Sequence, residues 1–401
     1  MAETHPRSLP DDRQPVIIAA RRTPICRAHG ALKTLHAHEL LAPVLRRLLN
    51  ETGVAPASVA DVVIGNAVGG GGNVARLAAL EAVLPVSVPG LTVDRQCGSG
   101  LDAIALASRL VAAGGGGVYL AGGVESISTA PLRARRNSDG APEFFPRAQF
   151  APLGLGDPDM GVAAETVAAR FGVGRDRQDA LALRSHQRAL ASAAAGAFAA
   201  EIVPLPGVSG PDGVRTVSAD DGPRRGLTAA VLARFPAVFA AGGTVTAGNS
   251  CFDADGAAAV VITSVEHARG LGARDGLLVR GTDTAGVDPQ LLGIGAAAAA
   301  ERLLERCGVT AGGLGLVEFN EAFASQTLAC LDRLGIPAER VNADGGALAL
   351  GHAYGASGAV LVTRLLAQAR RSPADGQLAL ALISIAGGMG TAALLEYRSF
   401  V

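Results

Sequence analysis

Short runs of apolar residues alternate along the chain with longer segments in which apolar residues recur every three or four positions. The short runs are typical of strands buried on both faces, and the longer segments are typical of buried or amphipathic helices. This alternation predicts an α/β fold in which helices cover a sheet. In the first third we expect strands over Val16–Ala20, Val62–Gly65 and Val118–Gly123, and helices over His38–Glu51 and Leu101–Ala113.

The last third of the chain repeats this order of elements. We expect a strand over Leu314–Phe319, although Gly315 weakens that prediction, and a second strand over Leu378–Ile385. Helices are expected over Ala324–Leu334 and Gly358–Arg370. The similarity lies in the order of elements and not in individual residues, and it favours two similar halves.

Residues 124–243, between the two halves, have a different character. Pro, Gly, Asp and Arg cluster at 131–159, and a second loop-rich stretch covers 204–226. Two amphipathic helices are expected between these stretches, over Val162–Phe171 and Arg175–Ala195. The pattern predicts an inserted region of loops and helices.

The composition excludes several classes of protein. A chain of 401 residues is long enough for roughly two or three domains. A net charge of -1 gives no electrostatic reason to expect nucleic acid or an anionic membrane as a partner. No apolar run approaches the ~18 residues of a membrane span. Met1–Gln14 lacks the apolar core of a secretory signal and the five cysteines are scattered, so we expect a cytoplasmic protein with free thiols.

Cys97 is the first residue whose surroundings indicate chemistry. It lies in the segment VDRQCGSGLDAIALA (93–107), where an extended lead-in ends at the thiol, two glycines allow a turn, and a helix-forming run follows. Unpaired N–H groups and the positive end of the helix macrodipole favour a thiolate over a thiol at such a position. The segment therefore predicts a reactive cysteine, whereas a lone cysteine would more often be a small buried apolar residue.

Two later segments, NEAFA (320–324) and NADGGALALGHAYGASG (342–358), form an ordered set with the Cys97 segment. With shorter matches such as Gly243–Asn249, this set resembles the thiolase family from about residue 16 to the C-terminus. The resemblance implies a thiolase-like α/β fold of two similar halves in helix–sheet layers with an inserted loop domain. It implies three parts, namely 1–123 with 244–272 as the N-terminal half, 124–243 as the loop domain over coenzyme A, and 273–401 as the C-terminal half.

The resemblance also implies an acyl-CoA C-acyltransferase that forms or cleaves 3-ketoacyl-CoA. Cys97 would carry the acyl group, His352 would accept the thiol proton, and Asn320 would orient a water toward the thioester oxygen. Coenzyme A would be a substrate, with no permanently bound cofactor and no metal, and the chain would form a homodimer or homotetramer. The residues expected to contact coenzyme A are Met160, Arg224, Arg225, Ala247, Ser250, Cys251 and Phe323, with Arg224 or Arg225 at the nucleotide.

The chain departs from the family pattern in the segment Ser384–Gly390, where the family has a second cysteine at the position of Ser384. Ala386 stands where a glycine N–H usually contributes to a second oxyanion hole, which could require an unusual backbone angle. A serine hydroxyl is a far weaker acid than a thiol. Ser384 therefore either replaces the cysteine or only forms hydrogen bonds, while Cys251 or His352 moves the proton.

Three functions follow from this departure. The first is an acyltransferase with an altered proton relay. The second is an acylated enzyme that transfers its acyl group to another nucleophile or drives condensation by decarboxylation. The third is a non-catalytic partner subunit that binds coenzyme A, against which the intact set of Cys97, Asn320 and His352 argues.

Two other motifs have simpler interpretations. Gly388–Ala393 fits a loose dinucleotide-binding pattern, but the eight residues that follow are too few for the helix and strand such a site needs. His36–Glu39 could suggest a metal site, but adjacent residues on a helix point in different directions, so we expect the start of a surface helix there.

Overall fold

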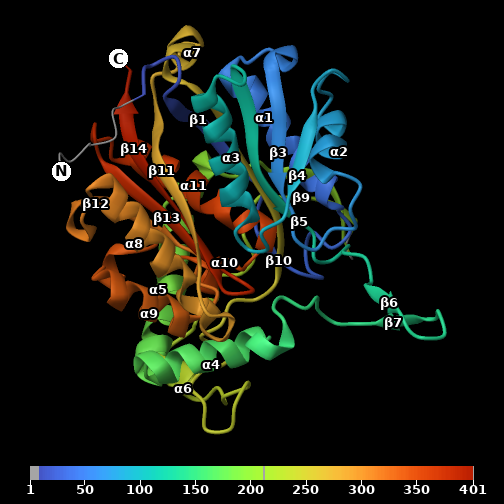
Figure 1. The fold of residues 1–401 in the computed structure, drawn as a ribbon, viewed down its shortest axis with the longest axis vertical. Helices are drawn as coiled ribbons and strands as arrows, with labels where there is room; N and C mark the ends of the chain where they lie inside the picture. The colour runs from blue at the N-terminus through green and yellow to red at the C-terminus, as the bar shows by residue number, and fades with distance from the viewer. Residues whose placement is uncertain (1–8, 211–212, 401) are drawn as a thin grey trace.

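The computed structural model describes residues 9–210 and 213–400, and its main strands form two groups (Figure 1). The first group consists of β1 (Pro15–Arg22), β3 (Val59–Gly65), β4 (Gly90–Val93), β5 (Val118–Glu125) and β10 (Ala254–Ser264), with the short β2 (Cys26–Arg27) beside β10. The second group consists of β11 (Asp275–Gly286), β12 (Leu314–Phe319), β13 (Leu378–Ile385) and β14 (Met389–Ser399).

The two groups have the same pairing pattern, which confirms the predicted pair of similar halves. In the first, β1 and β5 pair antiparallel with β10, whereas β5, β3 and β4 run parallel. In the second, β11 and β13 pair antiparallel with β14, and β13 runs parallel to β12. A parallel bridge between Val317 and Val341 takes the place that β4 has in the first group.

The sequence did not indicate how the two halves join. β1 pairs antiparallel with β11 through Val16–Leu278 and Ile17–Leu277. These two residue pairs connect all the main strands into one ten-stranded mixed sheet. The sheet is therefore continuous, but each half keeps its own repeat of the same topology.

Six helices form layers around the strands. α1 (Ala37–Thr52) and α2 (Val74–Glu81) cover the outer side of the first half, and α8 (Gly295–Cys307) and α9 (Ala324–Leu334) cover that of the second. α3 (Ser99–Ala113) and α11 (Tyr354–Arg371) pack side by side at the centre (Figure 1). Side chains of β1 alternate accordingly, since Val16 and Ile18 enter the outer core and Ile17 enters the central core.

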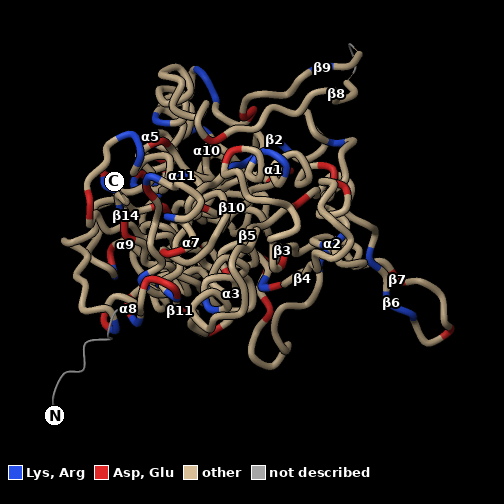
Figure 2. The backbone as a smooth tube through the Cα atoms, turned by 90° about the horizontal axis from the view of Figure 1, so that it is seen from above, with Lys and Arg blue, Asp and Glu red and all other residues tan. Residues whose placement is uncertain are grey.

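The region between the halves contains helices and two hairpins. Its elements are β6 (Ala134–Arg136), β7 (Pro142–Phe144), α4 (Met160–Phe171), α5 (Arg175–Ala194), β8 (Leu205–Gly210), β9 (Gly213–Val217) and α6 (Ala229–Ala233). α4 and α5 pack on α9, and α5 also packs on the short α10 (Ala347–Leu350). The β6–β7 hairpin extends away from the rest of the chain (Figure 2). The remaining helix, α7 (Val265–Gly270), follows β10.

The predicted helices and strands are present, and the structure adds strands that the sequence reading omitted. β10 contains the run Ala257–Ala259, and alanine is a poor strand former. The run is nevertheless fully buried between β1 and β5, where small side chains fit between the helix layers. α11 begins at Tyr354, four residues before the predicted start at Gly358.

Both motif interpretations are confirmed. Gly388 precedes the strand β14 and not a helix, which removes the dinucleotide pattern. At the start of α1, the backbone N–H of His36 donates to Glu39, which is the arrangement of a helix cap.

Glycines allow α3 and α11 to approach so closely that their backbones touch. A Cβ at Gly100 of α3 would lie 2.5 Å from the carbonyl oxygen of Gly355. A Cβ at Gly358 of α11 would lie 2.5 Å from the backbone nitrogen of Leu101. Real Cβ atoms do not come this close to backbone atoms, so the contact requires glycine at both positions.

We expect Gly100→Ala to lower the free energy of unfolding by ~1–3 kcal/mol, the usual cost of overpacking a filled core. Gly270→Ala is the matched control, because among the described residues its Cβ would meet no atom within 4 Å. Thermal or urea unfolding of both variants measures the difference. Equal midpoints for Gly100→Ala and the wild type would show that the two helices can separate without cost.

Candidate active site

A cavity of about 210 Å³ opens at the N-terminal ends of α3 and α11. Both halves and the inserted region contribute to its wall. The described residues that line it are Gln96, Cys97, Met160, Ala164, Phe239, Ser250, Cys251, Asp253, Leu292, Gly293, Ala322, Phe323, Gln326, His352, Tyr354, Ser384 and Ala386.

Cys97 lies in the turn before α3. Gln96 has a left-handed φ of 45°, and the N–H of Gly98 donates to the carbonyl of Arg95 at 2.9 Å. This tight turn presents the thiol to the cavity.

The expected preference for a thiolate at Cys97 is wrong. Burial raises the pKa of the thiol to about 12, although hydrogen bonds from the N–H groups of Ala386 and Cys97 act in the opposite direction. The N–H groups at the helix terminus favour the charged sulfur, but the loss of water around that sulfur disfavours it more strongly. Cys97 is therefore a neutral thiol at pH 7 and requires a base.

Three polar groups of His352 have hydrogen-bond partners, and one ring nitrogen has none among the described residues. Its backbone N–H donates to Phe252 at 2.9 Å, and its carbonyl accepts from Ala254 at 3.2 Å. On the ring, Nδ1 lies 2.6 Å from Ser357 Oγ, whereas Nε2 has no hydrogen-bond partner among the described residues. Burial lowers the pKa of His352 to about 4, so the imidazole is neutral at pH 7. An Nδ1–H donated to Ser357 leaves Nε2 as a free proton acceptor.

Asn320 does not line the same cavity as Cys97 and His352. Its side chain is 2% exposed and borders a separate cavity of about 20 Å³ together with Ser357. The Nδ2 group finds no acceptor within the part of the chain that the structure describes. A space of this size holds about one water molecule.

Ser384 lies in the cavity wall, but its hydroxyl is fully engaged. Oγ donates to the carbonyl of Gly293 at 2.6 Å and accepts from the N–H of Ala296 at 3.1 Å. Ala386 does not need the unusual backbone angle that the sequence raised. The left-handed φ angles fall on the next two residues, Gly387 (φ 83°) and Gly388 (φ 82°). Ala386 keeps an ordinary backbone and directs its N–H at Cys97.

The residues predicted to contact coenzyme A divide into two groups. Met160, Ser250, Cys251 and Phe323 line the cavity, and Phe323 makes an edge-to-face contact with Phe239 at 6.2 Å between ring centroids. Ala247, Arg224 and Arg225 are exposed residues outside the cavity lining. The N–H of Arg224 donates to Nδ1 of the buried His186 at 3.1 Å.

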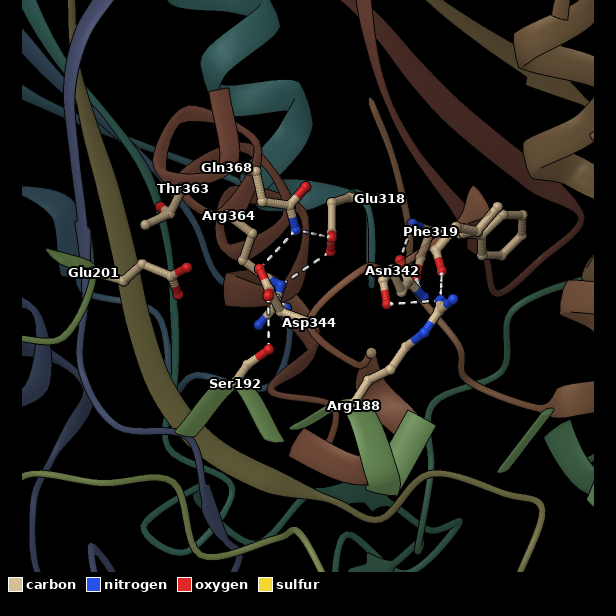
Figure 3. A network of polar contacts seen from close by, with 12 residues as sticks. Arg188, Ser192, Glu201, Glu318, Phe319, Asn342, Asp344, Thr363, Arg364 and Gln368 are labelled. Carbon is tan, nitrogen blue, oxygen red and sulfur yellow. Dashed lines mark hydrogen bonds and ion pairs between the residues drawn. The ribbon is translucent and has the colours of Figure 1, made fainter. Parts of the chain in front are cut away.

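A buried polar network fixes the strand and loop that carry Asn320 and His352 (Figure 3). Glu318 of β12 accepts from Arg364 at 3.0 Å and from Gln368 at 2.7 Å, both on α11. Gln368 also donates to Asp344 at 3.1 Å, and Asp344 accepts from Ser192 of α5 at 2.7 Å. The network joins the second half to the inserted region.

Two further residues, Asn342 and Glu125, anchor the loop before α11 and the start of that helix. Asn342, at a left-handed φ of 52°, donates to the carbonyl of Phe319 at 2.9 Å and to Glu321 at 2.7 Å. In the first half, buried Glu125 accepts from the N–H of Gly355 at 3.0 Å, at the first turn of α11. Burial raises the pKa of Glu125 to about 7. These residues hold His352 in place from both halves.

The sequence analysis missed a polar pair in the cavity wall. Tyr354 donates to Asp253 at 2.6 Å, and its ring packs edge-on against His352 at 5.1 Å between centroids. The two residues are 101 positions apart, so no sequence spacing could have indicated the contact.

Two family models match the chain, "Thiolase, N-terminal domain" over residues 15–266 and "Thiolase, C-terminal domain" over 277–397. The chain belongs to the thiolase family. This thiolase is therefore an acyltransferase that acts on coenzyme A thioesters without a permanently bound cofactor.

Several relatives match nearly the whole thiolase. A Bacillus subtilis protein named "Putative acetyl-CoA C-acetyltransferase YhfS" is 42% identical over 95% of this chain and 98% of its own. The VraB protein of Staphylococcus aureus (strain MRSA252), which has the same enzyme name, is 43% identical over 95% of this chain and 98% of its own. The crystal structure of the Bacillus anthracis acetyl-CoA acetyltransferase superposes with a TM-score of 0.88, at 34% identity, covering 96% of this chain and 99% of that one.

Two kinds of feature are absent from residues 9–210 and 213–400. No helix there is long and apolar enough to cross a membrane. Nor do three or more His, Cys, Asp or Glu side chains gather there in a way that could hold a metal ion.

We expect the alkylation rate of Cys97 by iodoacetamide to rise about tenfold per pH unit from pH 7 to pH 10 without a plateau. The thiolate fraction grows in this way at any pH below the pKa, and burial raises that pKa to about 12. Mass spectrometry of the Cys97 peptide measures the rate, with glutathione as a reference thiol. A plateau below pH 8 would mean that the N–H groups outweigh burial.

Proposed function

We propose that this thiolase is an acyl-CoA C-acyltransferase that forms or cleaves 3-ketoacyl-CoA through an acyl group carried on Cys97. The observation that supports this most strongly is that the thiol of Cys97 and the unpartnered Nε2 of His352 line one cavity. A nucleophile and a free base in one enclosed space are what covalent acyl transfer requires. The names of the relatives make acetyl-CoA the first substrate to test.

The acylation step follows from the neutral states of both groups. His352 Nε2 accepts the proton of Cys97 as the sulfur attacks a carbonyl carbon of the substrate, which is C3 in a 3-ketoacyl-CoA. For a 3-ketoacyl-CoA the bond between C2 and C3 then breaks, which leaves the acyl group on Cys97 and a carbanion at C2 of acetyl-CoA. Because burial disfavours both the thiolate and the imidazolium, the charges form only when substrate is present to share them.

Donors near Cys97 support stabilisation of the developing negative charge. The N–H groups of Ala386 and Cys97 point at the sulfur position and are available to an oxygen bound beside it. Asn320 is a candidate for the second set of donors through a water in its small cavity, beside the Ser357 that holds His352. Its unpartnered Nδ2 group supports this role.

Coenzyme A would enter past Met160, Phe239 and Phe323, whose apolar side chains suit the pantetheine arm. The nucleotide would lie toward Arg224 and Arg225, as the family resemblance implies. The guanidinium of Arg27 supports this direction, because it stacks 3.7 Å from the ring centroid of Phe252, next to Cys251. Burial and, after it, the positive charge of Arg224 lower the pKa of Arg27, so a phosphate there would relieve repulsion between two cations.

The surface supports a homo-oligomer. β4 pairs with β3 alone among the described strands and forms one end of the sheet. Apolar side chains are exposed on β4 and beside it, namely Leu91 of β4, Leu77 and Leu80 of α2, and Val83 and Val86 between the two elements. An unpaired strand next to an apolar patch is a surface that proteins usually cover.

The engaged hydroxyl of Ser384 favours a second candidate function. An enzyme that acylates Cys97 but cannot move a proton at the substrate's α-carbon would transfer the acyl group to another nucleophile or condense it by decarboxylation. Solvent deuterium exchange into acetyl-CoA separates the two candidates, since only the first requires removal of an α-proton.

We expect acetyl-CoA to add one acetyl group to Cys97, and Cys97→Ala to abolish this adduct. His352→Ala should slow adduct formation by roughly 10²–10⁴, the usual contribution of a positioned base. Intact-protein and peptide mass spectrometry after a rapid acid quench measures both effects. An unmodified wild-type chain, or acetylation at another residue, would contradict the proposal.

A further inference from the structure

Cleavage of a 3-ketoacyl-CoA needs a group that gives a proton to the C2 carbanion, and synthesis needs the same group to remove it. Ser384 occupies the position of the family's second cysteine but is not free for this task. Its proton lies on the carbonyl of Gly293 and its oxygen accepts from Ala296, so the hydroxyl anchors the start of α8. Another group in the cavity must move the proton.

We propose that Cys251 is this acid and base, an inference that rests on the acyl transfer proposed above. Cys251 lines the cavity together with Cys97 and His352. Its backbone is fixed on two sides, because its N–H donates to Ala322 at 2.9 Å and the next residue, Phe252, accepts from the N–H of His352 at 2.9 Å. A second thiol is thereby held in the space that holds the nucleophile.

The other titratable groups that line the cavity are committed elsewhere. The hydroxyl of Tyr354 donates to Asp253 at 2.6 Å, so these two groups are already paired with each other. His352 takes the proton of Cys97. Cys330 is fully buried outside the cavity lining and donates to the carbonyl of Gly293 at 3.3 Å.

The state of the Cys251 thiol suits a proton donor. Burial and the negative charge of Asp253 raise its pKa, so the sulfur holds its proton at pH 7. In cleavage, the C2 carbanion takes the proton from the Cys251 S–H, which gives acetyl-CoA and a thiolate on Cys251.

The second half-reaction restores the thiol. The Cys251 thiolate takes the proton from the S–H of incoming coenzyme A. The coenzyme A thiolate then attacks the acyl carbon on Cys97, and the acyl-CoA formed leaves behind a Cys97 thiolate. His352 returns to that sulfur the proton it accepted in acylation. No oxidant, reductant or further reactant is consumed.

Three readouts on the full-length protein test this assignment. They are acetylation of Cys97 by acetyl-CoA, exchange of solvent deuterium into the methyl group of acetyl-CoA, and cleavage of acetoacetyl-CoA by coenzyme A. The variants are Cys251→Ala and Cys251→Ser, and the second keeps nearly the same volume with a much weaker acid. Cys307→Ser is the matched control, because Cys307 is a half-buried thiol of α8 that does not line the cavity.

We expect both Cys251 variants to lose exchange and cleavage by roughly 10²–10⁴ while Cys97 is still acetylated, the size of effect usual for a positioned acid or base. Cys307→Ser should match the wild type in all three readouts. Undiminished exchange in Cys251→Ala would overturn the assignment, as would a wild type that acetylates Cys97 without any exchange. Loss of Cys97 acetylation in Cys251→Ser would also overturn it, by showing a structural role. A wild type that never acetylates Cys97 would refute the proposed function itself.

Discussion

The active site depends on the direct contact between the backbones of α3 and α11. Gly100 and Gly358 let the backbones of the two helices touch, so the turn before α3 and the loop before α11 meet at the same cavity. The turn before α3 carries Cys97 and the loop before α11 carries His352, although 255 positions separate these residues in the sequence. The topological repeat has a chemical consequence, because each half supplies one of the two groups that we propose to react.

Burial at this junction decides the electrostatics of the site. The same enclosure raises the pKa of Cys97 to about 12 and lowers that of His352 to about 4. The resting pair is therefore a neutral thiol beside a neutral imidazole, and charge separation is disfavoured until substrate and N–H donors can share the charge. Buried carboxylates such as Glu125 and Glu318 lie behind the site, where they hold the loop and the helix and do not reach the cavity.

Much of the fold could be predicted from local pattern, since long apolar runs such as Val118–Gly123 and Leu378–Ile385 leave few alternatives to a buried strand. The strand β10 could not, because its alanines are strand residues only by virtue of their neighbours. The pairing of β1 with β11 rests on two residue pairs, and no sequence signal marks them.

The sequence motifs predicted several of the residues that form the candidate site. They did not predict the protonation states and hydrogen bonds of those residues, which depend on burial and on neighbouring side chains. Cys97 and His352 come together as the motifs suggested, but the preference of Cys97 for a thiolate was wrong because the motif does not report burial. The sequence predicts that Ser384 departs from the family pattern, and only the contacts of Ser384 with Gly293 and Ala296 reveal that its hydroxyl is occupied. The residue boundaries of the three predicted parts and the roles of the individual site residues stay predictions.

Chemical cross-linking with 1,3-dibromoacetone tests most directly whether the helix contact brings nucleophile and base together. This short reagent first alkylates a thiol and then a second nucleophile within reach of three carbon atoms. We expect Cys97 to react and to become linked to His352, which digestion and mass spectrometry would show as one cross-linked peptide pair, most clearly in Cys251→Ser, where no second thiol competes. A folded protein in which Cys97 is alkylated but never linked to His352 would contradict the shared site.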